Sequence, residues 1–231
     1  MSNTRYIFML RRLATILAVT TLSLSLIAAL TGVLLAFYYG PLAGGANDSI
    51  KHIVNEVPNG WLIDSLHNIA GNGLIAVSLV QIVVMFLGRQ FRLGWLTAWI
   101  GGIFLTLTAI ALGWSAMNLD WTQLGYWRFN IELGTIESIP LVGSLLRDIL
   151  TGGGAIGTVT VQHLYALHSY VLSIGALILA IIHLVGLLVQ EREQKQVEAL
   201  LVDTETAEIS EQQEQDQGSN PLELQVNQGF S

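Results

Sequence analysis

The sequence predicts an all-helical integral membrane protein: a bundle of four transmembrane helices followed by a disordered acidic tail. Hydrophobic residues make up 52% of the 231-residue chain and charged residues only 12%. Four apolar stretches are each long enough to cross a hydrocarbon core, which takes roughly 20 helical residues. Ten of the seventeen acidic residues follow Gln190, in a Glu- and Gln-rich segment whose composition is typical of disordered chain.

The apolar stretches divide the chain into a short basic N-terminus (1–12), a membrane domain (13–190) and the tail (191–231). Within the membrane domain we expect spans at Leu13–Tyr39, Trp61–Leu87, Trp95–Leu119 and Val161–Gln190. A tight turn at 88–94 would join the second span to the third. The polar connection 40–60 could hold a short surface helix that opens at Asn47 or Asp48, and a long connection at 120–160 precedes the fourth span.

The basic residues predict the orientation of the four spans. Seven of them fall on the side of the termini and the short turn, and three on the side of the long connections. The seven are Arg5, Arg11, Arg12, Arg89, Arg92, Arg192 and Lys195, and the three are Lys51, Arg128 and Arg147. Because basic residues are enriched on the cytoplasmic side, both termini are expected on the cytoplasmic, negative side of the membrane.

The fourth span carries no charged residue but contains two histidines, His168 and His183. Fifteen helical steps separate them by ~22 Å along the axis and ~60° around it, so the two rings share roughly one side of the helix. A single membrane histidine often only satisfies a neighbouring hydroxyl or backbone group. A same-face pair instead favours two stacked metal or haem sites.

Composition excludes several kinds of function. The chain has no cysteine, which excludes disulfides, thiolate metal sites and covalently attached haem c. It has no basic patch that could hold nucleic acid. The spans place no acidic or basic residue deep in the bundle, so an ion channel or transporter finds little support.

Four motifs occur in an order and spacing that resemble a known family. They are GWLIDSLH at 60–67, DWTQLGYW at 120–127, GTIESIPLVG at 134–143 and LYALHSYV at 164–171. Over about residues 20–190 the chain is similar to cytochrome b6, the short four-helix form of the cytochrome b subunit in quinol-oxidising complexes, as a divergent member. The resemblance implies a bundle in which the second and fourth helices each provide two histidine ligands for two b-type haems.

Carried over residue by residue, the resemblance implies that His67 and His168 are the axial ligands of one haem. His183 matches a ligand of the second haem, but the position of its partner is occupied by Gln81. Because an amide is a weaker iron ligand than imidazole, the second site is either empty or holds a haem with one protein ligand and an open position.

At other positions the chain matches the family pattern only in part. Haem packing falls on Gly32, Gly102, Gly113 and Ala116, and the propionate region on His163, where the family has arginine. Asp64 likewise replaces an arginine there, and its charge would repel a propionate. In the positive-side loop, Tyr126, Pro140 and Gly143 match the pattern of the quinol-oxidation niche, which in the family also needs a glutamate from a partner subunit.

These implications lead to an expected function. The chain would be a membrane electron-transfer protein with at least one haem b, in a quinol-linked photosynthetic or respiratory chain. It would act as an electron-carrier subunit and not as an enzyme alone. Expected partners are membrane lipid, other membrane subunits of a cytochrome bc/b6f-like complex and quinone. The expected location is the thylakoid or plasma membrane of a cyanobacterial-type cell. The alternative is a non-catalytic, haem-poor scaffold or assembly subunit that kept the fold.

Overall fold

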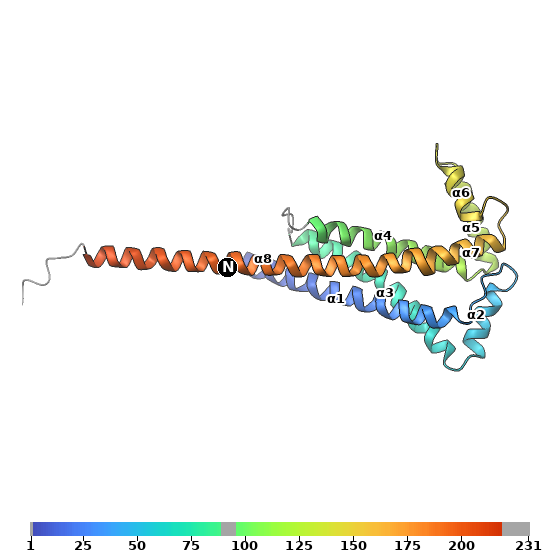
Figure 1. Cartoon of the computed structure of the whole chain (residues 1–231), viewed down its shortest axis with the longest axis horizontal. Coiled ribbons are helices and arrows are strands. Elements are labelled where there is room, and N and C mark those ends of the chain that lie inside the picture. Colours follow the sequence, from blue (N-terminus) through green and yellow to red (C-terminus); the bar gives the residue numbers. More distant parts are fainter. Residues whose placement is uncertain (1, 89–95, 219–231) are drawn as a thin grey trace, which may run out of the picture. The chain divides into compact units, whose positions relative to one another are not determined.

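The computed structural model of the chain describes residues 2–88 and 96–218, and every regular element within these ranges is a helix (Figure 1). This confirms the all-helical prediction. The chain divides into two units, Met1–Leu187 and Leu188–Ser231. The first unit contains the bundle and all the connections on which the candidate site depends.

Four long helical segments form the bundle. They are α1 (Ser2–Ala36), α3 (Gly60–Leu87), α4 (Leu96–Leu119) and a fourth segment made of α7 (Thr158–Ala166), the π-helical turn η2 (Leu167–Leu172) and α8 (Ser173–Gly218). All four are long and apolar enough to cross a membrane, as predicted. Their outward faces carry large apolar side chains such as Leu30 and Ile69, both 68% exposed, which suits contact with lipid.

The described helices begin and end within a few residues of most predicted bounds, and the largest differences are at the start of the first span and the end of the fourth. Helix α1 begins at Ser2 and not near Leu13, because residues 2–12 contain no glycine or proline and several strong helix formers. The predicted turn between the second and third spans lies, apart from Gly88, outside the described residues. Helix α4 is described from Leu96, one residue after the predicted start.

The connections on the long-loop side are themselves largely helical. Helix α2 (Ala46–Asn55) begins within two residues of its predicted start, and the connection 120–160 contains α5 (Gln123–Glu137) and α6 (Gly143–Thr151). The indole Nε1 of Trp114 donates to Glu132 Oε2 at 2.7 Å, which ties α5 to the end of α4. Figure 1 shows α2, α5 and α6 gathered at one end of the bundle, here called the loop end.

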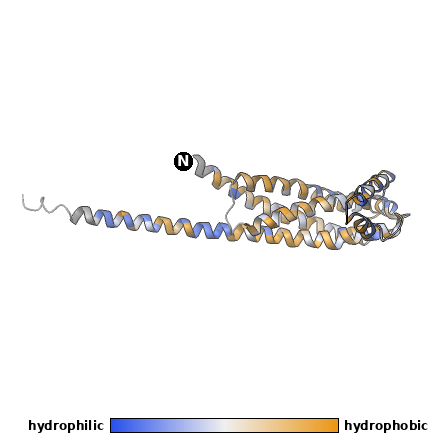
Figure 2. Cartoon of the chain, turned by 90° about the horizontal axis from the view of Figure 1, so that it is seen from above, coloured by the Kyte–Doolittle hydropathy of each residue, from blue (hydrophilic) through white to orange (hydrophobic). Residues whose placement is uncertain are grey.

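Residues 191–218 of the predicted disordered tail are helical, and its remainder, 219–231, lies outside the described residues. Helix α8 continues without a break to Gly218, so residues 191–218 are helical, and Figure 2 shows hydrophilic residues predominating along this part. The segment has no glycine or proline before Gly218 and is rich in Glu and Gln, which favour helix. A pair of oppositely charged side chains, Glu191 and Lys195, lies one turn apart at 3.0 Å. Low hydrophobicity predicts the lack of a packed core, not the lack of a helix.

Helices α4 and α8 approach each other closely at the end of the bundle opposite the loop end. A Cβ atom added to Gly186 would lie 3.0 Å from the backbone nitrogen of Ala98 and 3.1 Å from its Cα. Small residues at such a crossing let two membrane helices pack backbone to backbone.

We predict that Gly186→Leu lowers the melting temperature of the protein in detergent by about 3–10 °C, because the side chain would force α4 and α8 apart. The matched control is Gly175→Leu on the same helix, where an added Cβ meets no atom within 4 Å. Circular dichroism at the helix band measures both variants. Equal effects at the two positions would contradict the role given to the crossing.

Candidate functional site

A cavity of about 320 Å³ lies between the four bundle helices, near the loop end. Its wall includes His67 from α3 and His168 from the π-helical turn, which lie on facing segments of the bundle. Small residues make up much of the remaining wall: Ala28, Ala29, Gly71, Gly113, Ala116 and Ala176. Since small side chains leave the space between the helices open, the two imidazoles border a volume that a flat ligand can enter.

The ring of His67 is fixed by α1. Its Nδ1 lies 2.9 Å from the carbonyl oxygen of Ala28 and 3.1 Å from the hydroxyl of Thr31. A carbonyl oxygen can only accept, so Nδ1 carries the hydrogen and donates it to Ala28. This leaves Nε2 as the ring nitrogen with a free lone pair, which is the form of imidazole that ligates a metal.

His168 is fixed in the same way by α4. Its Nδ1 lies 2.9 Å from Ser115 Oγ, while that hydroxyl is within donating distance of the carbonyl oxygens of Ala111 and Leu112, at 2.9 and 3.0 Å. An arrangement in which the hydroxyl gives its hydrogen to the α4 backbone and accepts one from Nδ1 satisfies all these contacts and leaves Nε2 for a ligand. The π-helical turn that holds His168 is a local widening of a kind often found at functional sites.

The spacing of the two rings fits a shared metal ion. Their centres lie 6.3 Å apart, with the ring planes inclined at 61°. A metal–imidazole bond of about 2.0–2.1 Å, added to about 1.1 Å from nitrogen to ring centre, places two opposed ring centres about 6.3 Å apart. The residues present at this pair therefore fit two axial ligands of one haem iron.

The second histidine of the fourth segment has a different environment. His183 is only 1% exposed and Gln81 2%, and the Nε2 atoms of the two side chains lie 3.0 Å apart. The other ring nitrogen, Nδ1, lies 2.8 Å from the carbonyl oxygen of Ala98. Two ligands on opposite sides of one metal would have their nitrogens about 4 Å apart, so this pair does not fit a metal ion between its side chains.

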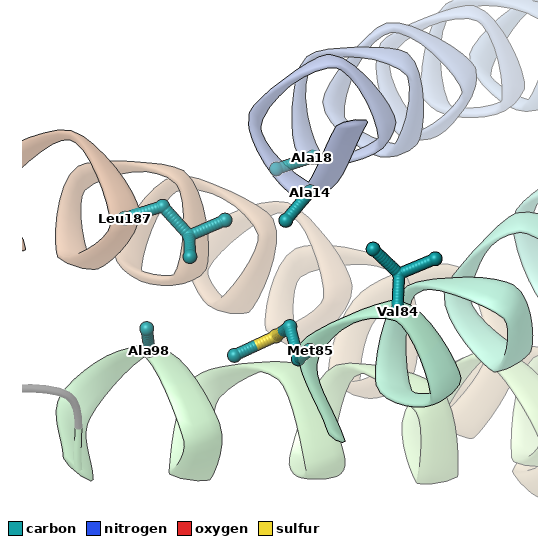
Figure 3. Packing of buried hydrophobic residues seen from close by; sticks show 6 residues of the cluster. All are labelled: Ala14, Ala18, Val84, Met85, Ala98 and Leu187. Carbon is teal, nitrogen blue, oxygen red and sulfur yellow. The ribbon is translucent and has the colours of Figure 1, made fainter. Parts of the chain in front are cut away.

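Beyond His183 the bundle closes in an apolar cluster (Figure 3). The cluster consists of Ala14, Ala18, Val84, Met85, Ala98 and Leu187, contributed by all four bundle segments. Met85, one turn beyond Gln81, is 1% exposed and belongs to this cluster. Its thioether fills space between helices, which is the usual role of a buried methionine.

The positions implied in haem packing separate into two groups. Gly113 and Ala116 line the cavity. Gly32 and Gly102 instead lie against histidine rings, since an added Cβ would come within 3.1 Å of His67 Cε1 and 2.9 Å of His183 Cε1, respectively. Glycine at these two positions lets an imidazole rest directly on the neighbouring helix.

The remaining candidates lie away from the cavity wall. His163 is exposed and its Nδ1 donates to the Ile149 carbonyl at 2.7 Å, which links α7 to α6. Tyr126 lies on α5, edge-to-face with Trp121 and Trp127. Pro140 lies in the turn between α5 and α6, and Gly143 begins α6, where a Cβ would overlap carbonyl oxygens of the preceding turn. The stretch 134–143 thus consists of the end of α5, a turn and the first residue of α6.

Sequence reasoning missed the residues that orient the two cavity histidines. Nothing in the sequence marks the carbonyl of Ala28, and Thr31 is one of several hydroxyl residues on α1. Ser115 is 0% exposed, and a lone serine among apolar residues of the third span was the one signal available.

Asp120, just after α4, was also missed as a part of the cavity wall. Its side chain keeps one side open to solvent. Burial of its other side is the main cause that raises the pKa of Asp120. The nearby carboxylate of Asp64 raises this pKa further, and the guanidinium of Arg128 opposes the rise. The polar end of the cavity therefore carries acidic and amide groups, including the wall residues Asn68 and Asn72.

A sequence model of the family described as cytochrome b/b6/petB matches residues 7–191. Two of the most similar curated proteins are named cytochrome b6, from a Desmonostoc species (34% identical) and from Mastigocladus laminosus (35% identical). Each match extends over 152 residues, 66% of this chain and 71% of the relative.

Among solved structures, the fold is similar to a chain titled hyperthermophilic respiratory Complex III, with a TM-score of 0.60 and 27% sequence identity. The match covers 76% of this chain and 47% of that chain. This chain therefore spans just under half the length of that relative.

We predict that Asp120→Asn stabilises the protein at neutral pH. A pKa raised on folding means that the ionised form weakens the folded state, and that this penalty disappears as the pH falls and the carboxyl takes up a proton. The melting temperature of the variant should exceed that of the wild type by about 1–3 °C at about pH 8, and the difference should vanish toward about pH 4. A difference that grows as the pH falls would contradict the assignment.

Proposed function

Since the chain belongs to the cytochrome b/b6 family, an integral membrane family, we propose that it is an electron carrier that binds haem b through His67 and His168. One observation carries the proposal: the two ring centres lie 6.3 Å apart, beside a cavity enclosed by all four bundle segments. When bound, haem b supplies reversible one-electron chemistry at its iron.

The protein's own groups hold the two imidazoles in place. The Ala28 carbonyl and the Ser115 hydroxyl each accept the Nδ1 hydrogen of one histidine. Such partners fix the tautomer and orientation of a ligating imidazole and raise the basicity of its other nitrogen. Both rings are thus prepared to bind iron before it arrives. All four bundle segments contribute to the wall of the cavity beside these rings.

We propose further that the chain acts as one subunit of a cytochrome bc/b6f-like complex. The similarity to a chain of a respiratory Complex III, of which this chain spans just under half, supports partners among other membrane subunits. Quinone is the proposed electron-exchange partner at the loop end, where Tyr126, Pro140 and Gly143 lie, and lipid surrounds the exposed apolar faces. An electron-carrier subunit of this kind completes a quinol-oxidising enzyme only together with its partners.

The proposed location is a thylakoid or plasma membrane, with both termini on the negative side. The distribution of basic residues supports the orientation, and the cyanobacterial relatives support the type of cell. Haem is held non-covalently in this proposal, since the chain has no cysteine. At the other end of the bundle, Gln81 in place of a histidine alters the second haem site.

The test is the haem content of the purified chain in detergent, measured by the pyridine haemochrome method together with reduced-minus-oxidised spectra. We expect a low-spin haem b in the wild type, lost in His67→Ala and in His168→Ala because each removes one axial ligand. The matched control is His52→Ala, which removes an exposed histidine on α2 that pairs with Glu56.

A folded, membrane-inserted wild type without haem would overturn this proposal. That result would favour the alternative, a scaffold or assembly subunit that retains only the fold. Retention of haem in both ligand variants would equally contradict the assignment of His67 and His168.

A second prediction concerns orientation and not ligation. Ser115→Ala removes the acceptor of the His168 Nδ1 hydrogen but leaves the ligating nitrogen, so haem should still bind, with an affinity about 10–100-fold lower. Titration of haem into the haem-depleted chain measures the change. Ser23→Ala serves as the control, since Ser23 is exposed and bonds only the backbone of its own helix. Unchanged affinity in Ser115→Ala would remove this positioning role.

A further inference from the structure

Both ring nitrogens of His183 have protein partners on two different helices. Nδ1 faces the Ala98 carbonyl of α4 at 2.8 Å, and Nε2 faces the Gln81 amide of α3 at 3.0 Å. Because the carbonyl oxygen can only accept, Nδ1 is the donor, and a neutral ring then has Nε2 as its acceptor. The amide nitrogen of Gln81 can donate to it. The imidazole therefore links α8 to both α3 and α4.

The orientation of the Gln81 amide follows from the same bonds. With its nitrogen turned toward His183, the amide oxygen is left buried without a hydrogen-bond partner among the described residues. Turning the amide over would place its oxygen against a ring nitrogen that carries no hydrogen. The amide orientation that forms the bond to His183 therefore leaves the Gln81 oxygen unpaired. This indicates that the bond to His183 determines how the Gln81 side chain is oriented.

Backbone packing leaves no gap between α4 and α8 at this level. A Cβ added to Gly101 would lie 3.3 Å from the Cα and backbone nitrogen of His183. One added to Gly102 would lie 2.9–3.0 Å from the imidazole itself. On the side away from the cavity, the apolar cluster that includes Val84 and Met85 follows directly. On its α4 side, this ring leaves no room for a flat macrocycle unless α4 and α8 move apart.

We propose that His183 and Gln81 form a structural tie that replaces a second haem, so that this chain holds a redox centre only at the His67–His168 end of the bundle. The part that concerns the redox centre rests on the proposed function. The tie itself does not, because it is a property of the polypeptide. On this proposal His183 is a positioning residue for the helices and not a metal ligand.

The first experiment measures haem per chain in the full-length protein in detergent. The wild type should contain one haem, which titrates as a single one-electron wave. His183→Leu should retain that haem and its spectrum, whereas His168→Leu, the matched change on the same helical segment, should lose it. Two haems in the wild type, or a haem signal lost specifically in His183→Leu, would overturn the proposal.

The second experiment tests the tie by thermal melting of both single variants and the double variant. His183→Leu leaves the Gln81 amide wholly unpaired, and Gln81→Leu leaves an imidazole nitrogen unpaired. Each should lower the melting temperature by about 2–10 °C. The double variant should melt at or above the less stable single variant, because replacing both partners by apolar groups removes the unpaired atom. If the losses in melting temperature of the two single variants add up in the double variant, the tie is overturned. If one single variant does not fold but the double variant does, that result supports the tie.

The two readouts separate the proposals from each other. Haem absent from the wild type would overturn the proposed function, and the melting experiment would still decide the tie. A second haem that depends on His183 would overturn the tie and leave the electron carrier with two centres.

Discussion

An imidazole inside a membrane bundle has two ring nitrogens, and the protein must give each of them a partner, because hydrocarbon provides none. The partner of one ring nitrogen is provided in the same way at His67, His168 and His183. In each, Nδ1 donates to an oxygen on an adjacent helix: the carbonyls of Ala28 and Ala98, and the hydroxyl of Ser115. The remaining nitrogen, Nε2, is therefore the atom whose surroundings distinguish one site from another.

At the loop end, the Nε2 atoms of His67 and His168 belong to rings that line a cavity walled by glycine and alanine. At the other end, the Nε2 of His183 is in hydrogen-bond contact with Gln81. One substitution accounts for much of this difference, because an amide can donate to a neutral imidazole whereas a second imidazole of the same tautomer cannot. Two histidines of this tautomer need a metal ion between them, whereas the Gln81 amide nitrogen can donate directly to the free ring nitrogen of His183.

Small residues serve both arrangements, with opposite results. Gly113 and Ala116 on α4 keep space open beside the loop-end pair. Gly101 and Gly102, about three to four turns earlier on the same helix, let α8 and the ring of His183 lie directly on the α4 backbone. A glycine in a membrane helix thus permits close approach, and the neighbouring polar groups decide whether a ligand or another helix comes close.

Much of the fold followed from the sequence because its causes are local. Apolar runs of more than twenty residues predict spans, while the expectation that Gln81 stands opposite His183 came from the family resemblance. The anchors of the histidines come from other helices and leave no local pattern. A π-helical turn at 167–172 depends on how the fourth segment packs, so the simple α-helical angle between His168 and His183 describes their relation only roughly. The helix at 191–218 was missed for a different reason. A polar composition indicates that a segment will not be buried, but this helix forms without being buried.

The two ends of the bundle therefore differ in what they can contribute to electron transfer. The cavity wall includes Asp120 at the loop end, where the side-chain amide of Asn47 on α2 donates to the Asp120 carbonyl at 3.0 Å. The tie at His183 lies ~22 Å further along the membrane normal if the fourth segment is taken as a straight helix. On the proposal that the His183–Gln81 pair replaces a second haem, this end of the bundle carries no electron, and an apolar cluster lies beyond the pair. On the proposed function, an electron that enters from the loop end must leave from the same end or pass sideways to another subunit within the membrane. A complex that contains this chain would then need a different redox centre to reach the negative side.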